Sequence, residues 1–178
     1  MPVRESSGAI TLTQALWIAG FAAVTAVGAQ VEIPHYPVPY TLQTMFVLLS
    51  GALLGKRNGA ISQLLYLAAG ASGLPVFSQF GFGIGKLLGP TGGYLLAFPV
   101  AAFVVGYLQE NRKNVVTSFV AMIAGLFVIF TLGTVQLYFT FFHDMTAAVK
   151  GGFLIFSWWD GAKLLAAAGI ASVISRRK

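Results

Sequence analysis

The sequence contains no cysteine and few charged residues. Without cysteine there can be no disulfide, no thiolate nucleophile and no cysteine-based metal site in this chain of 178 residues. Asp, Glu, Lys and Arg together make up 9% of it, whereas an ordinary soluble domain has about 25%. A chain so poor in charge cannot cover a soluble core with polar side chains. Because His35 and His143 are isolated, we also expect no bound metal and no cofactor.

Motifs of common catalytic sites are missing as well. The sequence has no Gly-x-Ser-x-Gly, no paired histidine ligands and no phosphate-binding loop ending in Gly-Lys-Ser/Thr. The glycines at positions 81, 83 and 85 lack the strand and helix that a dinucleotide fingerprint requires. We therefore expect no enzyme, and because the chain cannot hydrolyse ATP through the phosphate-binding motif, any energy from ATP must come from another subunit.

Long apolar runs dominate what is present. Hydrophobic residues make up 57% of the chain, and their continuous runs exclude the alternating strands of a transmembrane barrel. A helix needs about 20 residues to cross roughly 30 Å of hydrocarbon. We therefore predict a single domain over residues 1–178, an all-α integral membrane protein with six transmembrane helices in a compact bundle. Hydropathy places the spans near Leu12–Ala29, Thr41–Leu54, Ala60–Gly73, Gly92–Leu108, Val115–Phe139 and Phe153–Ile174.

The basic residues give the orientation of these spans. They are scattered between apolar runs, so the net charge of +6 forms no basic face for nucleic acid. With six spans, only Lys86 and Lys150 fall on one side of the membrane. Under the positive-inside rule the other side, with both termini, is cytoplasmic. Its basic residues are Arg4, Lys56, Arg57, Arg112, Lys113, Arg176, Arg177 and Lys178.

Three connections between spans have distinctive sequences. Residues 55–59 are so short a link that the second and third spans should form a tight helical hairpin. The segment 30–40 carries three prolines, which favour a stiff, extended strap. The segment 74–93 combines many glycines with phenylalanines, and so apolar a loop should fold back over the helices as a lid or re-entrant segment. A purely structural plug is the alternative for this last segment.

Asp160 and Lys163 are the two ionisable residues that lie deep in an apolar run. Charges within a span cost about 2.5–3.5 kcal/mol each on insertion scales, so they normally face a cavity and serve a function. At positions i and i+3 they share one helix face and offer an acceptor and a donor of opposite sign. Such a pair suits a ligand with an N–H edge and an anionic or carbonyl group. Gly161 leaves room for a ring, and Trp159 offers aromatic surface to stack on it.

Other interpretations of these residues stay open on the sequence alone. The pair could be a structural salt bridge, or an interfacial pair in which Lys163 extends to the polar boundary. Tryptophans in such positions also serve as interface anchors. In the first span, Ala15, Ala19 and Ala23 recur every four residues, a spacing that lets another helix approach closely. By spacing alone, packing within the chain is the preferred interpretation of that row, and docking of a partner helix is the alternative.

Four sequence stretches, in this order and register, resemble the BioY family, the biotin-specific substrate-binding subunits (S components) of energy-coupling factor (ECF) transporters. The resemblance covers nearly the whole chain. The stretches are Leu42-Gln-Thr-Met-Phe-Val-Leu-Leu-Ser-Gly-Ala-Leu-Leu-Gly, Gly73-Leu-Pro-Val-Phe, Gly89-Pro-Thr-Gly-Gly-Tyr-Leu and Asp160-Gly-Ala-Lys163.

The resemblance implies high-affinity biotin binding in a bacterial or archaeal cell membrane, at an external site capped by the loops after the first and third helices. It also implies a transmembrane coupling subunit (T component) and two cytoplasmic ATPases as partners. The alanine row of the first helix, Ala15, Ala19 and Ala23, then matches the patch that docks the coupling subunit, which reverses the preference stated above.

The resemblance also assigns ligand-binding residues. Asp160 and Lys163 match the polar residues of the last helix, where Asp160 can accept from the ureido N–H groups of biotin and Lys163 can donate to an oxygen. Gln79 is the candidate from the loop between the third and fourth helices. Gln43 and Tyr94 are further candidates, with bracing of a helix end as their alternative role. The rival functions are an S component for another vitamin, a stand-alone facilitator, and a small membrane enzyme with Asp160 as base, which lacks a second catalytic group.

Overall fold

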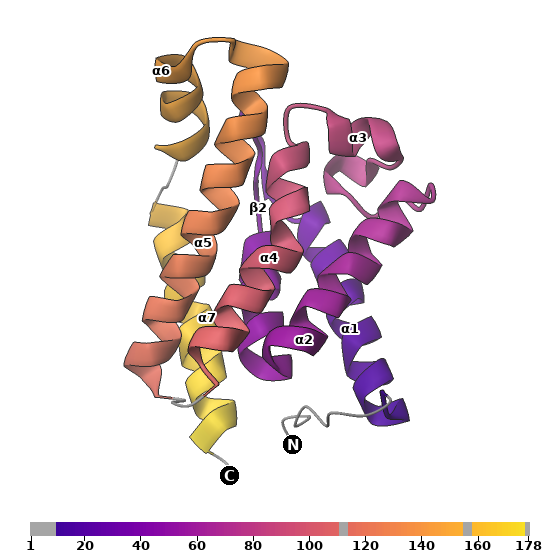
Figure 1. Ribbon diagram of the computed structural model, residues 1–178, viewed down its shortest axis with the longest axis vertical. Coiled ribbons are helices and arrows are strands. Elements are labelled where there is room, and N and C mark those ends of the chain that lie inside the picture. The colour runs from indigo at the N-terminus through magenta and orange to yellow at the C-terminus, as the bar shows by residue number, and fades with distance from the viewer. Residues whose placement is uncertain (1–9, 111–113, 155–157, 177–178) are drawn as a thin grey trace.

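The computed structural model describes residues 10–110, 114–154 and 158–176, which form a bundle of long helices standing side by side (Figure 1). The long helices are α1 (Leu12–Gln30), α2 (Gln43–Ala71), α4 (Gly92–Leu108), α5 (Val115–Leu137) and α7 (Trp158–Arg176). Between them lie β1 (Glu32–Ile33), β2 (Tyr40–Thr41), a 3-10 turn (Ser78–Phe80), α3 (Ile84–Leu88), α6 (Met145–Ala148) and two π-helical turns (Tyr138–Phe142 and Val149–Phe153).

Helix α2 contains two of the predicted spans, joined at a sharp break. The break is Gly55, whose φ of 84° and ψ of 175° only glycine adopts readily. The two halves then run back along each other: a Cβ on Gly59 would lie 2.8 Å from the Cα of Gly51. Across the same seam the Gln63 amide donates to the Ser50 hydroxyl at 3.1 Å. The predicted helical hairpin is confirmed, but one residue makes the turn where five were expected.

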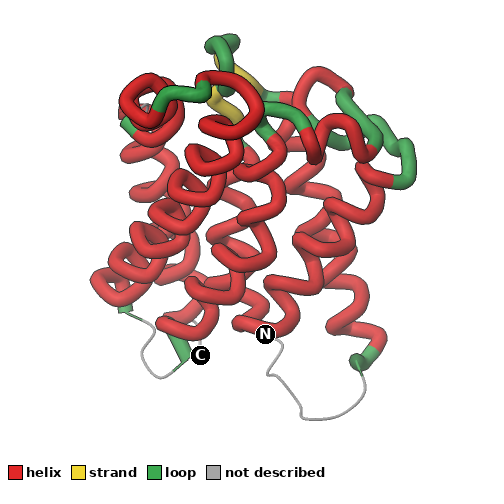
Figure 2. Tube along the Cα trace, turned by 45° about the horizontal axis from the view of Figure 1, so that its top comes forward, coloured by secondary structure: helices red, strands yellow, loops and turns green. Residues whose placement is uncertain are grey.

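Counting the two halves of α2, the chain crosses the bundle six times, as predicted. Figure 1 shows the start of α1 and the end of α7 at the same end of the bundle, and β2, α3 and α6 at the other. In Figure 2 the strands and most described loops gather at that second end. This arrangement fits an even number of crossings, because the three connections that contain β2, α3 and α6 lie at the end opposite to both termini.

Glycine and alanine let the central helices approach closely. A Cβ on Gly51 would lie 2.2 Å from the carbonyl oxygen of Ala102, so α2 and α4 touch through their backbones. Many large apolar side chains point outward instead, as the helices of a membrane bundle require. By length and composition, Leu12–Gln30 and Val115–Phe142 are candidate spans among the described residues, and Gly92–Leu108 is a shorter apolar helix.

The last helix begins later than hydropathy predicts. The predicted span started at Phe153, whereas a π-helical turn covers Val149–Phe153 and α7 begins at Trp158. Hydropathy cannot separate an apolar connection from an apolar span, because both are rich in phenylalanine and leucine. As a consequence Asp160 lies in the first turn of α7 rather than deep within a span.

The two segments predicted to be external also differ in detail from the expectation. The strap is not extended throughout: β1 and β2 pair antiparallel, with Glu32 opposite Thr41, so it is a short hairpin. The segment 74–93 is anchored by the fully buried Phe77, which packs edge-on against Tyr66 at 5.5 Å. The side chain of Gln30 ties it to α1 by donating to the carbonyl of Phe77 at 3.0 Å. The segment therefore folds back on the helices as expected, while other apolar side chains of it stay exposed, namely Leu74, Phe80, Phe82, Ile84 and Leu88.

Candidate ligand-binding site

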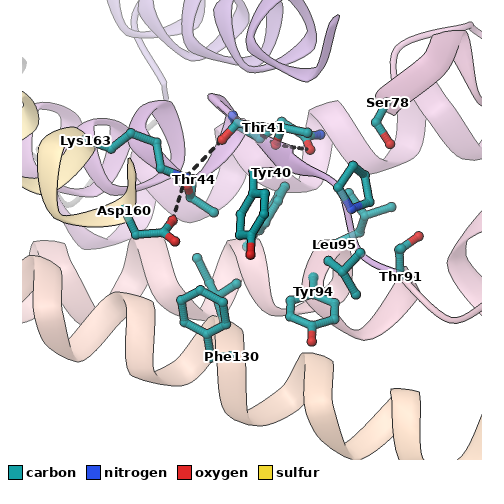
Figure 3. Close-up of a pocket in the computed structure, with 15 residues that line it drawn as sticks. Tyr40, Thr41, Thr44, Ser78, Thr91, Tyr94, Leu95, Phe130, Asp160 and Lys163 are labelled. Carbon is teal, nitrogen blue, oxygen red and sulfur yellow. Dashed lines mark hydrogen bonds and ion pairs between the residues drawn. The ribbon is translucent and has the colours of Figure 1, made fainter. Parts of the chain in front are cut away.

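A pocket of about 600 Å³, its open mouth included, lies among the strap and the helix ends near it (Figure 3). Its wall combines a few polar groups with a larger apolar surface, as is usual for small-molecule sites. Six parts of the chain contribute: the strap with β2, the start of α2, the segment before α4, the first two turns of α4, the middle of α5, and the start of α7. The lining residues are Val38, Pro39, Tyr40, Thr41, Gln43, Thr44, Ser78, Thr91, Tyr94, Leu95, Phe98, Ile129, Phe130, Asp160 and Lys163.

An ion pair between Asp160 and Lys163 forms one end of the pocket. The Lys163 Nζ lies 2.6 Å from Asp160 Oδ1, and the two residues are only 6% and 2% exposed. The helix places them together because residues three apart share one face. The first turn of α7 also favours the carboxylate, since the amino end of a helix carries partial positive charge. The sequence prediction that these two side chains face a cavity agrees with their position.

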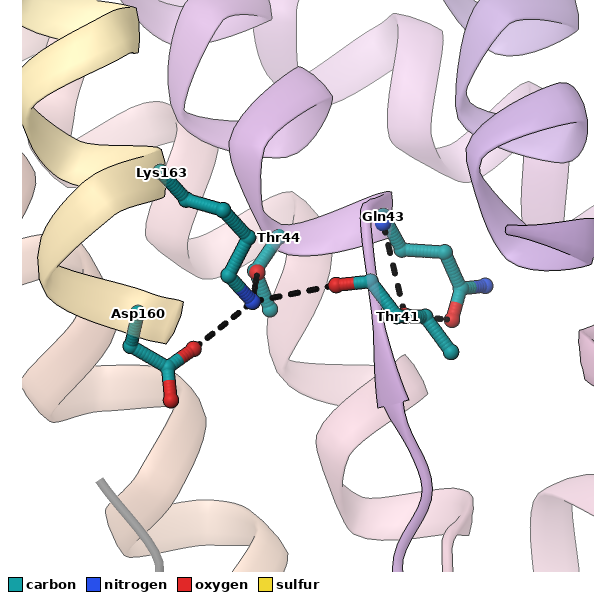
Figure 4. Close-up of polar contacts among 5 residues, drawn as sticks. All are labelled: Thr41, Gln43, Thr44, Asp160 and Lys163. Atoms are coloured by element: carbon teal, nitrogen blue, oxygen red, sulfur yellow. Dashed lines mark hydrogen bonds and ion pairs between the residues drawn. The ribbon is translucent and has the colours of Figure 1, made fainter. Parts of the chain in front are cut away.

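Lys163 also joins α7 to the strap and to α2. Its ammonium donates to the carbonyl oxygen of Thr41 at 3.0 Å and to the hydroxyl of Thr44 at 2.7 Å (Figure 4). With Asp160 Oδ1 as the third acceptor, each of the three N–H donors of the ammonium has a partner. The buried charge is therefore fully satisfied, and its position depends on groups from three elements.

Gln43 lines the pocket, but its polar atoms bind other residues. Its Oε1 accepts from the Thr41 hydroxyl at 2.9 Å, and its Nε2 donates to the hydroxyl of Tyr66. Tyr66 in turn donates to the carbonyl of Val76 at 3.2 Å. These bonds brace the start of α2 against the segment that follows it, which is the alternative role considered for Gln43.

The other predicted ligand residues are placed differently. The ring of Tyr94 lines the pocket, while its hydroxyl donates away to the carbonyl of Gly152 at 2.9 Å. Gln79 is exposed, does not line the pocket, and donates to Glu32 Oε1 at 3.0 Å. The neighbour of Gln79, Ser78, lines the pocket instead. The side chain of Trp159 lies outside the described residues.

The alanine row of α1 faces outward. Ala15, Ala19 and Ala23 are all exposed, whereas Ile18 and Phe21, on the opposite face, are buried in the core. The row therefore does not serve the close packing of α1 within the described part of the chain. Its role in docking a partner remains a prediction.

Several pocket residues were not predicted from the sequence. The hydroxyl-bearing ones are Tyr40, Thr41, Thr44, Ser78 and Thr91. Their only sequence signal is position: each lies within three residues of a predicted candidate, or inside the motif Gly89-Pro-Thr-Gly-Gly-Tyr. Hydroxyl residues are common at the ends of membrane helices, so nothing in their type marks them as pocket residues.

Known proteins resemble this chain in sequence and in fold. A biotin transporter BioY of Thermotoga maritima is 45% identical over 151 residues, 85% of this chain and 89% of its own length. A probable biotin transporter BioY of Pyrococcus horikoshii is 47% identical over 116 residues, 65% of this chain and 68% of its own length.

A solved structure and a family model extend the comparison. The crystal structure of the S component for biotin from an ECF-type ABC transporter superposes with a TM-score of 0.85, at 24% identity, covering 94% of this chain and 95% of that one. At that identity the likeness shows the fold, that of an ECF S component. The sequence model of the BioY family matches residues 3–178. This chain, a helical membrane protein with the fold of an ECF S component, belongs to the BioY family.

Proposed function

We propose that this chain is the biotin-binding S component of an ATP-driven ECF transporter, and that it has no catalytic activity of its own. The observation that carries the proposal is the buried pair Asp160 and Lys163 at the end of a pocket, in a chain of the BioY family. Relatives named as biotin transporters make biotin the leading ligand.

The two ends of the ion pair match the ureido ring of biotin. The ring presents two N–H donors and one carbonyl, so Asp160 accepts from an N–H while Lys163 donates to an oxygen. Lys163 makes that bond by exchanging one of its present acceptors, Thr41 or Thr44. The apolar wall, which includes Leu95, suits the sulfur-containing ring and the alkyl tail.

Uptake then depends on partner subunits. The sequence has no phosphate-binding loop, so two cytoplasmic ATPases supply the energy through a transmembrane coupling subunit. The outward row Ala15, Ala19 and Ala23 suits close contact with a helix of that subunit, because small side chains let two backbones approach. The assembly belongs in the cell membrane of a bacterium or an archaeon.

Equilibrium binding of labelled biotin to the detergent-purified chain tests the proposal. We expect one biotin per chain, displaced by unlabelled biotin and not by thiamine or riboflavin. Displacement by another vitamin in preference to biotin would identify an S component of different specificity. A folded sample that binds no biotin would contradict the proposal.

A further inference from the structure

The segment between α2 and α4 exposes several large apolar side chains. Their exposed fractions lie between 54% and 69%, and the residues are Leu74, Phe80, Phe82, Ile84 and Leu88. Lys86 is the one charged residue in the sequence of positions 74–93. A group of exposed large apolar residues marks a contact with another apolar surface, since a connection that lies in water normally presents polar side chains.

The backbone of this segment is fixed, so these side chains are held outward. The side-chain amide of Gln136 on α5 donates to the carbonyl of Leu87 at 2.9 Å and to that of Gly89 at 2.7 Å. The side chain of Leu87 packs against the core. Because Ile84 and Leu88 are four residues apart, they share one face of α3, and both are exposed. The described part of the bundle therefore holds the inner side of the segment and leaves its outer side uncovered.

The exposed side continues the outward apolar surface of the neighbouring helices. Helix α3 packs against α2 and α4, and Figure 1 shows it at the end of the bundle opposite to both termini. Both neighbours also present large apolar side chains outward: Leu64 and Leu65 on α2, and Leu96 and Val100 on α4. In a membrane protein such side chains contact lipid tails, which are as apolar as leucine. The exposed side of segment 74–88 therefore lies where the lipid-facing surface reaches one edge of the membrane.

Lys86 adds a positive charge at the same place. Its side chain lies along the turn before α3, because a Cβ on Gly81 would be 3.2 Å from Lys86 Cε. Within the ranges that the structure describes, Lys86 has no ion-pair partner. A lysine with its stem on apolar surface and its ammonium unpaired suits the boundary of a bilayer, where the ammonium meets lipid phosphates.

We propose that residues 74–88 bind the surface of the lipid bilayer, in the leaflet on the side opposite to both termini. The exposed apolar side chains reach roughly 5–10 Å into the boundary between headgroups and acyl chains, and Lys86 contacts lipid phosphates. This lipid contact goes beyond the proposed function, because it requires a membrane protein but not biotin as the ligand. Since Ser78 of the same segment lines the pocket, the bilayer then borders one wall of the ligand site.

Spin labels at single cysteines test the lipid contact directly, because the chain has no cysteine of its own. Phe82→Cys and Leu88→Cys carry the label in nanodiscs of phosphatidylcholine and phosphatidylglycerol, and neither residue lines the pocket. Helix α4 supplies two references: Val100→Cys, exposed near its middle, and Glu110→Cys, exposed just beyond its end. The measurement compares the collisions of each label with oxygen, which concentrates in lipid, and with a water-soluble nickel complex.

We expect the oxygen-to-nickel ratio at positions 82 and 88 to lie well above that of Glu110→Cys and below that of Val100→Cys. A ratio equal to that of Glu110→Cys at both positions would overturn the proposal, since both side chains would then face water. Shielding of both labels from both reagents would also overturn it, because a protein surface such as a second copy would then cover the segment. Melting temperature and elution volume in detergent check that the variants are folded.

The charge is tested with Lys86→Glu in the Phe82→Cys background. The added carboxylate is repelled by anionic headgroups, so the ratio at position 82 should fall toward that of Glu110→Cys, and should fall less in phosphatidylcholine alone. Lys150→Glu makes the same change of charge outside the segment and should leave the ratio unchanged. No fall with Lys86→Glu, or an equal fall with Lys150→Glu, would contradict the contact with phosphates. None of these measurements uses biotin, so a chain that binds no biotin would contradict the proposed function alone.

Discussion

At the residue scale, the buried ammonium of Lys163 depends on acceptors from three elements. Asp160 supplies one from α7, Thr41 a carbonyl from the strap, and Thr44 a hydroxyl from α2. A buried ion pair of this kind is weak evidence for stability, because removing two charges from water offsets most of their attraction. The presence of this ion pair in the wall of a pocket is better explained by ligand binding, which requires both charges.

The first prediction concerns the balance of the pair. Lys163→Met leaves the buried carboxylate of Asp160 without its counter-charge, and should destabilise the protein by about 3–5 kcal/mol. Asp160→Asn/Lys163→Met removes both charges and should recover most of that loss, yet bind no biotin. Thermal unfolding in detergent measures the first effect and labelled biotin the second. A double variant as unstable as Lys163→Met would show that the pair is mainly structural.

A second prediction concerns Thr44, whose hydroxyl orients the ammonium. Thr44→Val keeps the shape of the side chain but removes the acceptor, so biotin should bind about fivefold to tenfold more weakly, an effect of about 1–1.5 kcal/mol. Thr44→Ser should restore most of the affinity. Titration calorimetry on both variants measures the difference, and unchanged affinity in Thr44→Val would remove this residue from the site.

At the element scale, close backbone contacts between helices set where the pocket residues lie. Gly51→Ala would place a methyl group 2.2 Å from the carbonyl oxygen of Ala102, so α2 and α4 must separate. We expect a loss of about 1–3 kcal/mol, as for other overpacked sites. Gly20→Ala is the matched control, because nothing lies within 4 Å of its Cβ position. Equal melting temperatures for the two variants would contradict the close approach of α2 and α4.

The outward face of α1 carries a separate prediction. Ala19→Leu and Ala23→Leu each add a bulky side chain to an exposed position, so they should prevent close docking of a partner helix and abolish ATP-coupled biotin uptake in cells. Biotin binding by the purified chain should be unchanged. Val120, exposed on α5, provides the control Val120→Leu, which should transport normally. Loss of binding together with uptake would indicate a structural role for the row instead.

At the scale of the whole molecule, the sequence predicted the number of crossings and that Asp160 and Lys163 face a cavity. Both follow from strong signals: long apolar runs, and two charges in one of them. The start of α7 at Trp158 was not predictable, because the preceding connection is as apolar as the span. The one-residue turn at Gly55 was not predictable either. Lys56 and Arg57 are charged residues typical of an exposed loop, but in the structure they continue helix α2.

The site was predictable only in part. Asp160 and Lys163 could be predicted as pocket residues because charged residues within an apolar run are rare and easily recognised in a sequence. The pocket residues Thr44 and Ser78 were not predicted, because their positions depend on which segments the fold brings together. Thr44, for example, contacts Lys163, which lies more than a hundred residues later in the sequence. Gln79 was the predicted candidate of this loop, but in the turn at positions 77–81 it is Ser78 that lines the pocket.

The central claim, that the buried pair at the start of α7 binds biotin, is tested most directly by the dissociation constant of biotin for Asp160→Asn beside the unaltered protein. We expect one tight site in the unaltered protein. Asparagine keeps the shape of the side chain and loses the charge. In the variant, binding should be weaker by about tenfold to a hundredfold, the effect of one charge-assisted hydrogen bond. Equal affinity of the two folded proteins would contradict it.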